Sequence, residues 1–106
     1  MQLRELAKTL LIRGIGPALR DLFGVTGVLV DPKLEVFKSD GTKVAENDNW
    51  EPALATVFDQ VGAFRFSSGS KDAALSVSLP PGAYTVQVSG VANVTGDGMV
   101  ELYELP

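Results

Sequence analysis

Residues 72–89, which read DAALSVSLPPGAYTVQVS, decide the fold class of this chain. In both halves of the stretch, apolar residues alternate with small or polar ones, which is the period of a β-strand with one buried face. Pro80-Pro81-Gly82 separates the two halves with residues that favour a turn. The stretch therefore predicts two strands of an antiparallel sheet. The apolar positions are Leu75, Val77 and Leu79, followed by Tyr84, Val86 and Val88.

The neighbouring segments continue the pattern of short strands and turns. Lys33–Lys38 and Lys43–Glu46 flank Asp40-Gly41, a dipeptide that is typical of a β-hairpin turn. Further strands are expected at residues 8–13, 63–66 and 99–105, where short apolar runs lie between glycines, prolines and polar clusters.

One segment has a convincing helical period. Residues 51–61 carry apolar side chains at the i, i+3, i+4 and i+7 positions, so we predict a short amphipathic helix with Asn49 as its N-terminal cap. A long, bent loop is the alternative for this segment. Pro17–Phe23 supports a single helical turn, with proline at an acceptable early position.

These elements predict an all-β fold: two antiparallel sheets of six to eight short strands in all, packed as a β-sandwich or jelly roll, with one short helix. The 106 residues fit the usual size of one domain. We expect residues 1–106 to form a single β-sandwich domain that belongs to a larger multidomain protein.

The composition excludes several classes of function. The chain has no cysteine and no histidine, which excludes thiol chemistry, sulfur-ligated metals and His-based catalytic triads. Its net charge is −4 and its nine Lys and Arg residues are scattered, which argues against nucleic acid as a partner. No apolar run approaches the roughly 20 residues of a membrane span. Paired carboxylates are the one catalytic arrangement left, and because the acids fall mostly in turns we predict no enzyme.

The order of the sequence blocks resembles a module of large secreted bacterial proteins. The blocks are RGIGP at 13–17, NDNW at 47–50, LPPGAYT at 79–85 and ELY at 101–103. More distantly, the succession is similar to bacterial pre-peptidase C-terminal domains, β-sandwich modules attached to secreted enzymes and surface proteins. The resemblance implies an extracellular or cell-surface accessory module without catalytic residues. It also implies that calcium, proteins or polysaccharides are bound by some related sandwiches.

Asn47, Asp48 and Asn49 are the main candidates for an ion site. Calcium takes about six to eight oxygen ligands from carboxylates, amides and carbonyls, and this turn supplies three such side chains. Asp72 or Asp97 would add to the shell if the fold brings their loops close. The run lacks the alternating spacing and the closing Glu of a self-contained calcium loop, so a simple turn is the alternative.

Two other features favour structural roles. Trp50, the single tryptophan, is predicted to fill a core rather than to stack on a sugar. The glycines that follow Arg13 lack the Gly-Lys-Ser/Thr ending of a phosphate-binding loop. We therefore expect a backbone bend in which Arg13 pairs with a carboxylate, either Asp31 or Glu101.

Together these observations predict a non-catalytic extracellular module that acts as a structural spacer or a protein-interaction unit and needs no cofactor. The alternative is a calcium-dependent module that binds polysaccharide or protein. The expected partners are other domains of the parent protein, or an extracellular protein or polysaccharide. The polar faces of the strands offer a contact surface, which carries Ser76, Ser78, Thr85, Gln87 and Ser89.

Overall fold

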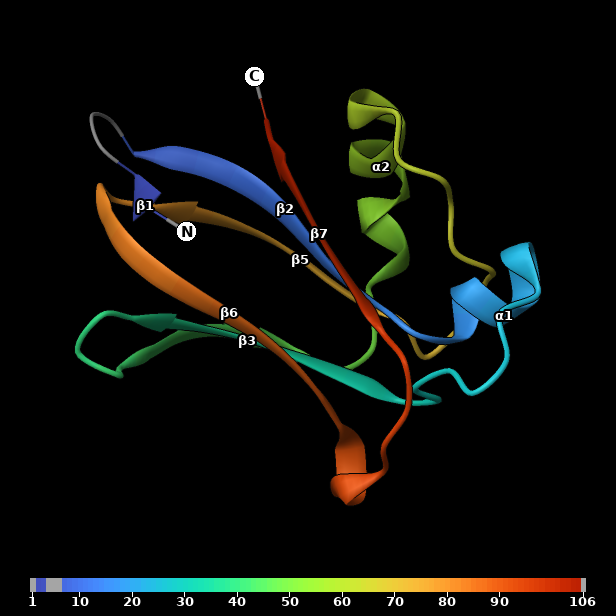
Figure 1. Cartoon of the computed structure of the whole chain (residues 1–106). Coiled ribbons are helices and arrows are strands. Elements are labelled where there is room, and N and C mark those ends of the chain that lie inside the picture. Colours follow the sequence, from blue (N-terminus) through green and yellow to red (C-terminus); the bar gives the residue numbers. More distant parts are fainter. Residues whose placement is uncertain (1, 4–6, 106) are drawn as a thin grey trace.

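The structure is a computed structural model that describes residues 2–3 and 7–105 (Figure 1). Its helical elements are α1 (Pro17–Phe23), α2 (Ala55–Val61) and two 3₁₀ turns, η1 (Pro52–Leu54) and η2 (Val91–Asn93). Its strands are β1 (Gln2–Leu3), β2 (Lys8–Ile15), β3 (Pro32–Lys38), β4 (Lys43–Asn47), β5 (Ala73–Leu79), β6 (Gly82–Gly90) and β7 (Met99–Glu104).

The strands form two antiparallel sheets that pack face to face. One sheet has the order β1-β6-β3-β4 and the other has the order β5-β2-β7. The predicted all-β sandwich is therefore confirmed, and Figure 1 shows the two sheets as separate layers. An aliphatic core lies between them, and its buried members are Leu10, Ile12, Leu34, Val36, Ala73, Leu75, Leu79 and Tyr84.

A second core covers the outer face of the β5-β2-β7 sheet. Helix α2 and the chain on either side of it pack there, so β2 is enclosed on both faces and is buried from Leu10 to Ile15. This explains why β2 is a continuous apolar run rather than an alternating one. The buried members of the second core are Leu11, Ile15, Ala18, Trp50, Phe58, Ala63, Phe66 and Ala74.

The predicted hairpin is confirmed at Asp40-Gly41. β3 and β4 pair in antiparallel register on either side of it, and Gly41 has a φ of +89°, in the left-handed region that favours glycine. Asp40 Oδ1 accepts a hydrogen bond from the backbone N–H of Thr42 at 2.9 Å. This bond lowers the pKa of Asp40 and links the turn to the returning strand.

The helical segments differ from the prediction in detail. The predicted helix begins as η1, and α2 carries no side-chain N-cap, so the expected cap by Asn49 is wrong. The segment 17–23 forms the seven-residue helix α1, which is longer than one turn. Within the described ranges, neither helix is long and apolar enough to cross a membrane.

Residues 63–66 were expected to form a strand and instead form an irregular segment. The backbone N–H of Ala63 donates to the carbonyl oxygen of Phe58 at 2.9 Å, which ends α2. Ala63 and Phe66 then enter the second core. Burial of these side chains, rather than strand pairing, therefore determines the path of the segment.

Arg13 is the centre of the second core. Its side chain is fully buried, and its guanidinium carbon lies 4.6, 4.4 and 4.2 Å from the ring centroids of Phe58, Phe64 and Phe66. Its Nε lies 2.9 Å from Glu101 Oε1, so the expected carboxylate partner is Glu101 and not the alternative, Asp31. Its Nη1 donates to the carbonyl oxygen of Phe64 at 2.6 Å. Burial lowers the pKa of Arg13, and the nearby Glu101 opposes this shift.

The two glycines after Arg13 allow close approaches of the backbone. A Cβ at Gly14 would lie 3.1 Å from Val88 Cγ2 of the facing sheet. A Cβ at Gly16 would overlap the carbonyl oxygen of Leu29. The RGIGP block therefore forms a buried structural bend, as the sequence predicted.

Candidate functional site

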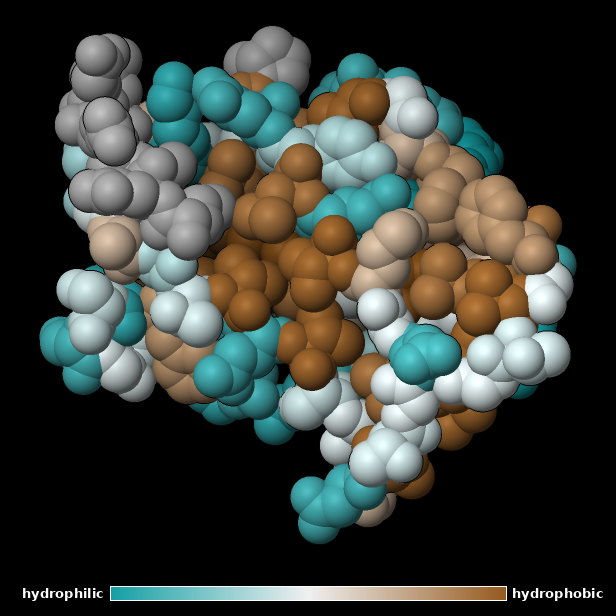
Figure 2. All heavy atoms as spheres, viewed as in Figure 1, coloured by the Kyte–Doolittle hydropathy of each residue, from teal (hydrophilic) through white to brown (hydrophobic). Residues whose placement is uncertain are grey.

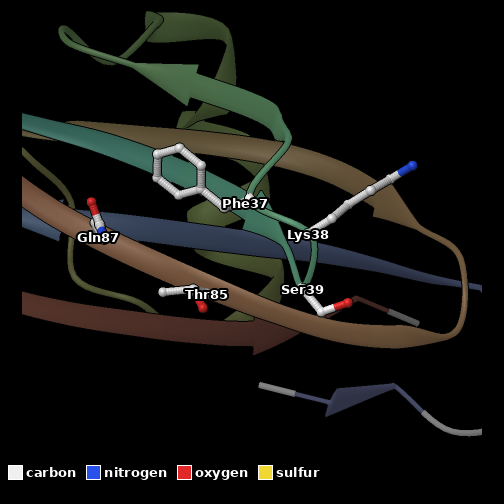
Figure 3. Close-up of a pocket in the computed structure, with 6 residues that line it drawn as sticks. Phe37, Lys38, Ser39, Thr85 and Gln87 are labelled. Carbon is white, nitrogen blue, oxygen red and sulfur yellow. The ribbon is translucent and has the colours of Figure 1, made fainter.

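An open hollow of about 270 Å³ lies on the outer face of the β1-β6-β3-β4 sheet, beside the β3–β4 hairpin. Figure 3 shows Phe37 of β3 facing Thr85 and Gln87 of β6 across this surface. Thr85 is the antiparallel partner of Phe37, so both side chains point away from the aliphatic core. The remaining lining residues are Lys38, Ser39 and Gly41.

A β-bulge in β4 lies beside this hollow. Val36 pairs with Ala45, whereas Phe37 pairs with Lys43, so Val44 is the extra residue on β4. Bulges of this kind change the direction of side chains at the end of a hairpin. β3 itself alternates regularly, so Phe37 faces outward with Thr85 and stands as a half-buried aromatic ring on an otherwise polar face.

The lining of the hollow offers both apolar and polar contacts. An aromatic ring, an amide and two hydroxyl groups can hold a ligand that has one apolar face and polar edges. Its lining residues include no carboxylate that could act as an acid or a base. Lys38 is the cation among the lining residues, and its amine extends away from the ring in Figure 3.

The predicted ion cluster divides into two parts. Asn47 joins strand ends: its Oδ1 accepts from the backbone N–H of Ala74 at 3.1 Å, and its Nδ2 donates to the carbonyl oxygen of Asn49 at 3.0 Å. The side chain of Asn49 is exposed. Both polar atoms of the Asn47 side chain are therefore already bonded within the fold.

Asp72 is fully buried, and its carboxylate holds the RGIGP bend. Its Oδ1 accepts from the backbone N–H groups of Gly16 at 2.8 Å and Ala18 at 3.1 Å. Its Oδ2 accepts from the hydroxyl of Ser70 at 2.8 Å. The carboxylate of Asp72 therefore accepts three hydrogen bonds from the protein itself, and its role is structural.

Asp48 lies instead beside Asp31, a residue that sequence reasoning did not place in the ion cluster. Burial is the main cause that raises the pKa of Asp48, and a hydrogen bond and the like charge of Asp31 add to it. One carboxylate oxygen of each residue, Oδ1, is buried without a hydrogen-bond partner. Lys71 Nζ lies 4.0 Å from Asp31 Oδ2. Asp31 comes directly before Pro32, where β3 begins, and this position at a strand end is the sequence feature that could have marked Asp31 as a candidate.

The structure does not join the other expected ligands to this pair. Across residues 2–3 and 7–105, no group of three or more Asp, Glu, His or Cys side chains is close enough to hold a metal ion. The peptide N–H and C=O of Asp97 bond to Gly27 and Leu29, in an exposed loop. An ion at Asp31 and Asp48 would therefore also need backbone or water oxygens.

The residues of the expected polar contact surface lie on two different sheets, and Trp50 lies in the second core. Ser76 and Ser78 face the α2 side of the β5-β2-β7 sheet, opposite Leu11 and Thr9, whereas Thr85, Gln87 and Ser89 face outward from the other sheet. They do not form one contact surface. Trp50 is buried against Phe58 and Phe66, which confirms its core position.

The fold and the hollow define this chain as a two-sheet β-sandwich with an open, polar-rimmed surface site. In comparisons with protein-family models, curated proteins and solved structures, nothing matched the chain. Its function is therefore argued from its own residues.

Proposed function

We propose that this chain is a non-catalytic accessory module of an extracellular or cell-surface protein, and that it makes contacts through the outer face of its β1-β6-β3-β4 sheet. The observation that carries this proposal is the hollow in which Phe37 faces Thr85 and Gln87. The bacterial modules that the sequence resembles support the extracellular assignment. In this role the sandwich acts as a rigid scaffold, and the sheet face recognises a protein or a polysaccharide.

The assignments of the acidic side chains support a role without catalysis. Asp72 holds a backbone bend, and Glu101 pairs with the buried Arg13. Glu46 lies in a second hollow of about 230 Å³ beside the end of β4. A hydrogen bond from Lys43 lowers the pKa of Glu46, which is the opposite of what a general acid needs.

A titration with soluble polysaccharides, followed by ¹⁵N–¹H NMR, tests this proposal. We expect the amides of residues 37–41 and 85–87 to shift, and we expect Phe37→Ala to abolish the shifts. The matched control is Phe23→Ala, which removes the same ring from an exposed site on α1. Turnover of chromogenic ester, peptide or glycoside substrates that is lost in Asp31→Asn or Asp48→Asn would overturn the proposal.

A calcium-dependent binding module is the second candidate. The specific observation in its favour is that Asp31 and Asp48 lie together, each with a buried carboxylate oxygen that has no hydrogen-bond partner. A divalent cation would remove the repulsion between the two carboxylates and use both free oxygens. The residues that would hold it are Asp31 and Asp48, with Asn47, Asn49 and Asp72 in the surrounding structure.

Thermal unfolding after EDTA treatment, followed by addition of calcium, tests the second candidate. A cation that binds only the native state stabilises it by about 2.7 kcal/mol at a hundredfold excess over its dissociation constant. We expect the midpoint to rise and Asp48→Ala to abolish the rise. An unchanged midpoint at every calcium concentration up to the millimolar range would eliminate this candidate.

A further inference from the structure

The outward-facing side chains of β6 form a row of neutral polar groups that starts beside Phe37. Thr85, Gln87 and Ser89 occupy alternate positions of this strand, and all three are exposed. Because an antiparallel strand rises about 3.4 Å per residue, the row is about 14 Å long. Figure 3 shows Thr85 and Gln87 on the strand next to that of Phe37. A flat ring and a line of hydroxyl and amide groups therefore lie together on one sheet face.

The charged side chains of the same sheet face are paired with one another. Lys33 Nζ and Lys43 Nζ lie 3.7 and 2.7 Å from Glu46 Oε2, and Lys43 Nζ also lies 3.3 Å from Glu35 Oε2. These residues belong to β3 and β4, whereas residues 82–90 of β6 include no charged side chain. The row on β6 therefore offers hydrogen bonds without charge, and electrostatic complementarity favours a ligand that is itself uncharged.

The composition of this face is unlike the centre of a protein–protein interface. Such a centre is rich in large aromatic side chains that become fully desolvated on binding. Here Phe37 is the one aromatic side chain that lines the hollow, and the row on β6 consists of Thr, Gln and Ser. A sugar ring has a small apolar face of C–H groups, which makes dispersion contacts with a phenyl ring, and hydroxyl groups around it. One aromatic ring beside a polar row is complementary to that shape.

A second exposed surface has the opposite character. Figure 2 shows apolar side chains gathered between the two sheets. Val100 and Leu102 of β7 lie on the inner face of their sheet with Ile12, and they are 40% and 45% exposed. A saccharide placed against such side chains would lose hydrogen bonds with water and gain none, which costs free energy. Of the two surfaces, the outer face is the one that suits a ligand rich in hydroxyl groups.

We propose that the ligand of the outer sheet face is a linear, uncharged polysaccharide that lies along β6. One sugar ring stacks on Phe37, and the following units form hydrogen bonds with Gln87 and Ser89. The amide of Gln87 has both donors and an acceptor, which matches the two roles of a hydroxyl group. The assignment rests on the function proposed above and specifies the class of ligand for the same site.

Binding of hexasaccharides that differ in charge tests the class of ligand. The probes are cellohexaose and laminarihexaose, which are neutral, hexagalacturonate, which is acidic, and hexaglucosamine, which is basic. In isothermal titration we expect a neutral probe to bind at least about tenfold more tightly than either charged probe, because a charge would be desolvated here without a partner. Added salt should not change the affinity of the neutral probe, since it forms no ion pair. In ¹⁵N–¹H NMR the amides of residues 37–39 and 85–89 should shift.

Two pairs of variants test the contacts themselves. Phe37→Leu keeps an apolar side chain but removes the flat ring, and it should weaken binding at least about tenfold. Phe23→Leu is its control, because Phe23 on α1 is 60% exposed. Gln87→Leu removes the amide at similar size and should also weaken binding about tenfold. Gln60→Leu makes the same change at an exposed position of α2, and both controls should bind as wild type does.

The outcomes distinguish a wrong ligand class from a wrong contact surface. Tighter binding of a charged probe, with shifts at residues 37–39 and 85–89, would overturn the uncharged ligand and retain the sheet face as the contact surface. Equal affinity of Phe37→Leu and wild type would overturn the stacking. Shifts confined to residues outside this face would overturn both the ligand site and the function on which it rests. Absence of binding for every probe would overturn the polysaccharide in favour of a protein partner.

Discussion

The two cores of this molecule lie on opposite faces of the β5-β2-β7 sheet and use different chemistry. The core between the sheets is aliphatic, with Tyr84 as its one aromatic member. The core under α2 contains Trp50, Phe58 and Phe66, and the rings of Phe58 and Phe66, together with that of Phe64, lie over the cation of Arg13. Alternating strands suffice to build the first core. The second also takes in irregular backbone at residues 63–66, whose N–H and C=O groups need polar partners inside the protein.

That difference indicates how each core responds to substitution. Aliphatic contacts lose energy in proportion to the atoms removed. A buried ion pair fails more abruptly, because removal of one partner leaves the other charge buried without compensation. Four substitutions test this contrast, in order of the effect that we expect.

The largest effect is expected from Arg13→Ala. It leaves Glu101 without its cation and opens a cavity among three phenyl rings, so we expect a loss of about 3–5 kcal/mol in the free energy of unfolding. Urea unfolding followed by the fluorescence of Trp50 measures this loss. Arg20→Ala is the control, because Arg20 is 54% exposed and pairs only with its neighbour Asp21. Equal losses in the two variants would show that the buried ion pair contributes no more to stability than an exposed one.

Asp72→Ala should have the next largest effect. It removes the acceptor of the Gly16 and Ala18 N–H groups, and each orphaned donor costs about 1–3 kcal/mol. Asp72→Asn keeps an oxygen at the same position, so we expect a clearly smaller loss in urea unfolding. If the two variants unfold at the same urea concentration, the hydrogen bonds to Oδ1 do not hold the bend.

Sequence reasoning succeeds for the features of this molecule that depend on a local pattern. Alternation at 73–79 and 82–90 predicts β5 and β6, because each strand has one buried face. The Asp40-Gly41 turn predicts the hairpin, because its backbone conformation is local. A carboxylate partner for Arg13 was predicted as well, because a charge in an apolar strand needs to be neutralised, although the sequence left Asp31 and Glu101 as alternatives.

The ion cluster and the surface site were less predictable, because they depend on long-range packing. Asp72 was expected beside Asp48, yet the tertiary fold directs its carboxylate to Gly16, far away in sequence. Asp31 approaches Asp48 only when β3 and β4 pair. The Phe37 hollow depends on the pairing of β3 with β6, which brings Thr85 beside Phe37 although the two residues are far apart in sequence.

Gly14→Ala tests the closeness of the two sheets. The new Cβ would lie 3.1 Å from Val88 Cγ2, so we expect overpacking to cost about 1–2 kcal/mol. The double variant Gly14→Ala with Val88→Ala makes room for the new methyl group. Its loss in urea unfolding should be smaller than the sum of the two single losses. Simple additivity would mean that the sheets can move apart without cost.

The smallest effect concerns Asp48, which lies beside Asp31, and it depends on pH. Because the folded state raises the pKa of Asp48, folded protein holds this proton to higher pH than unfolded protein does. Stability therefore falls as pH rises from the ordinary Asp value toward the raised one. Asp48→Asn cannot lose a proton, so without calcium it should be more stable than wild type at neutral pH.

Urea unfolding in EDTA, repeated from acid to neutral pH, measures the difference in the free energy of unfolding between Asp48→Asn and wild type at each pH. We expect the difference to be smallest at acid pH and to grow through that window. Asp59→Asn should change stability in the opposite direction and destabilise the protein, because the hydrogen bond from Arg65 lowers the pKa of Asp59. Its loss should appear at neutral pH and vanish as Asp59 becomes protonated. If both variants change stability in the same direction, the carboxylate pair with Asp31 does not repel in the folded state, and the case for a cation between them fails.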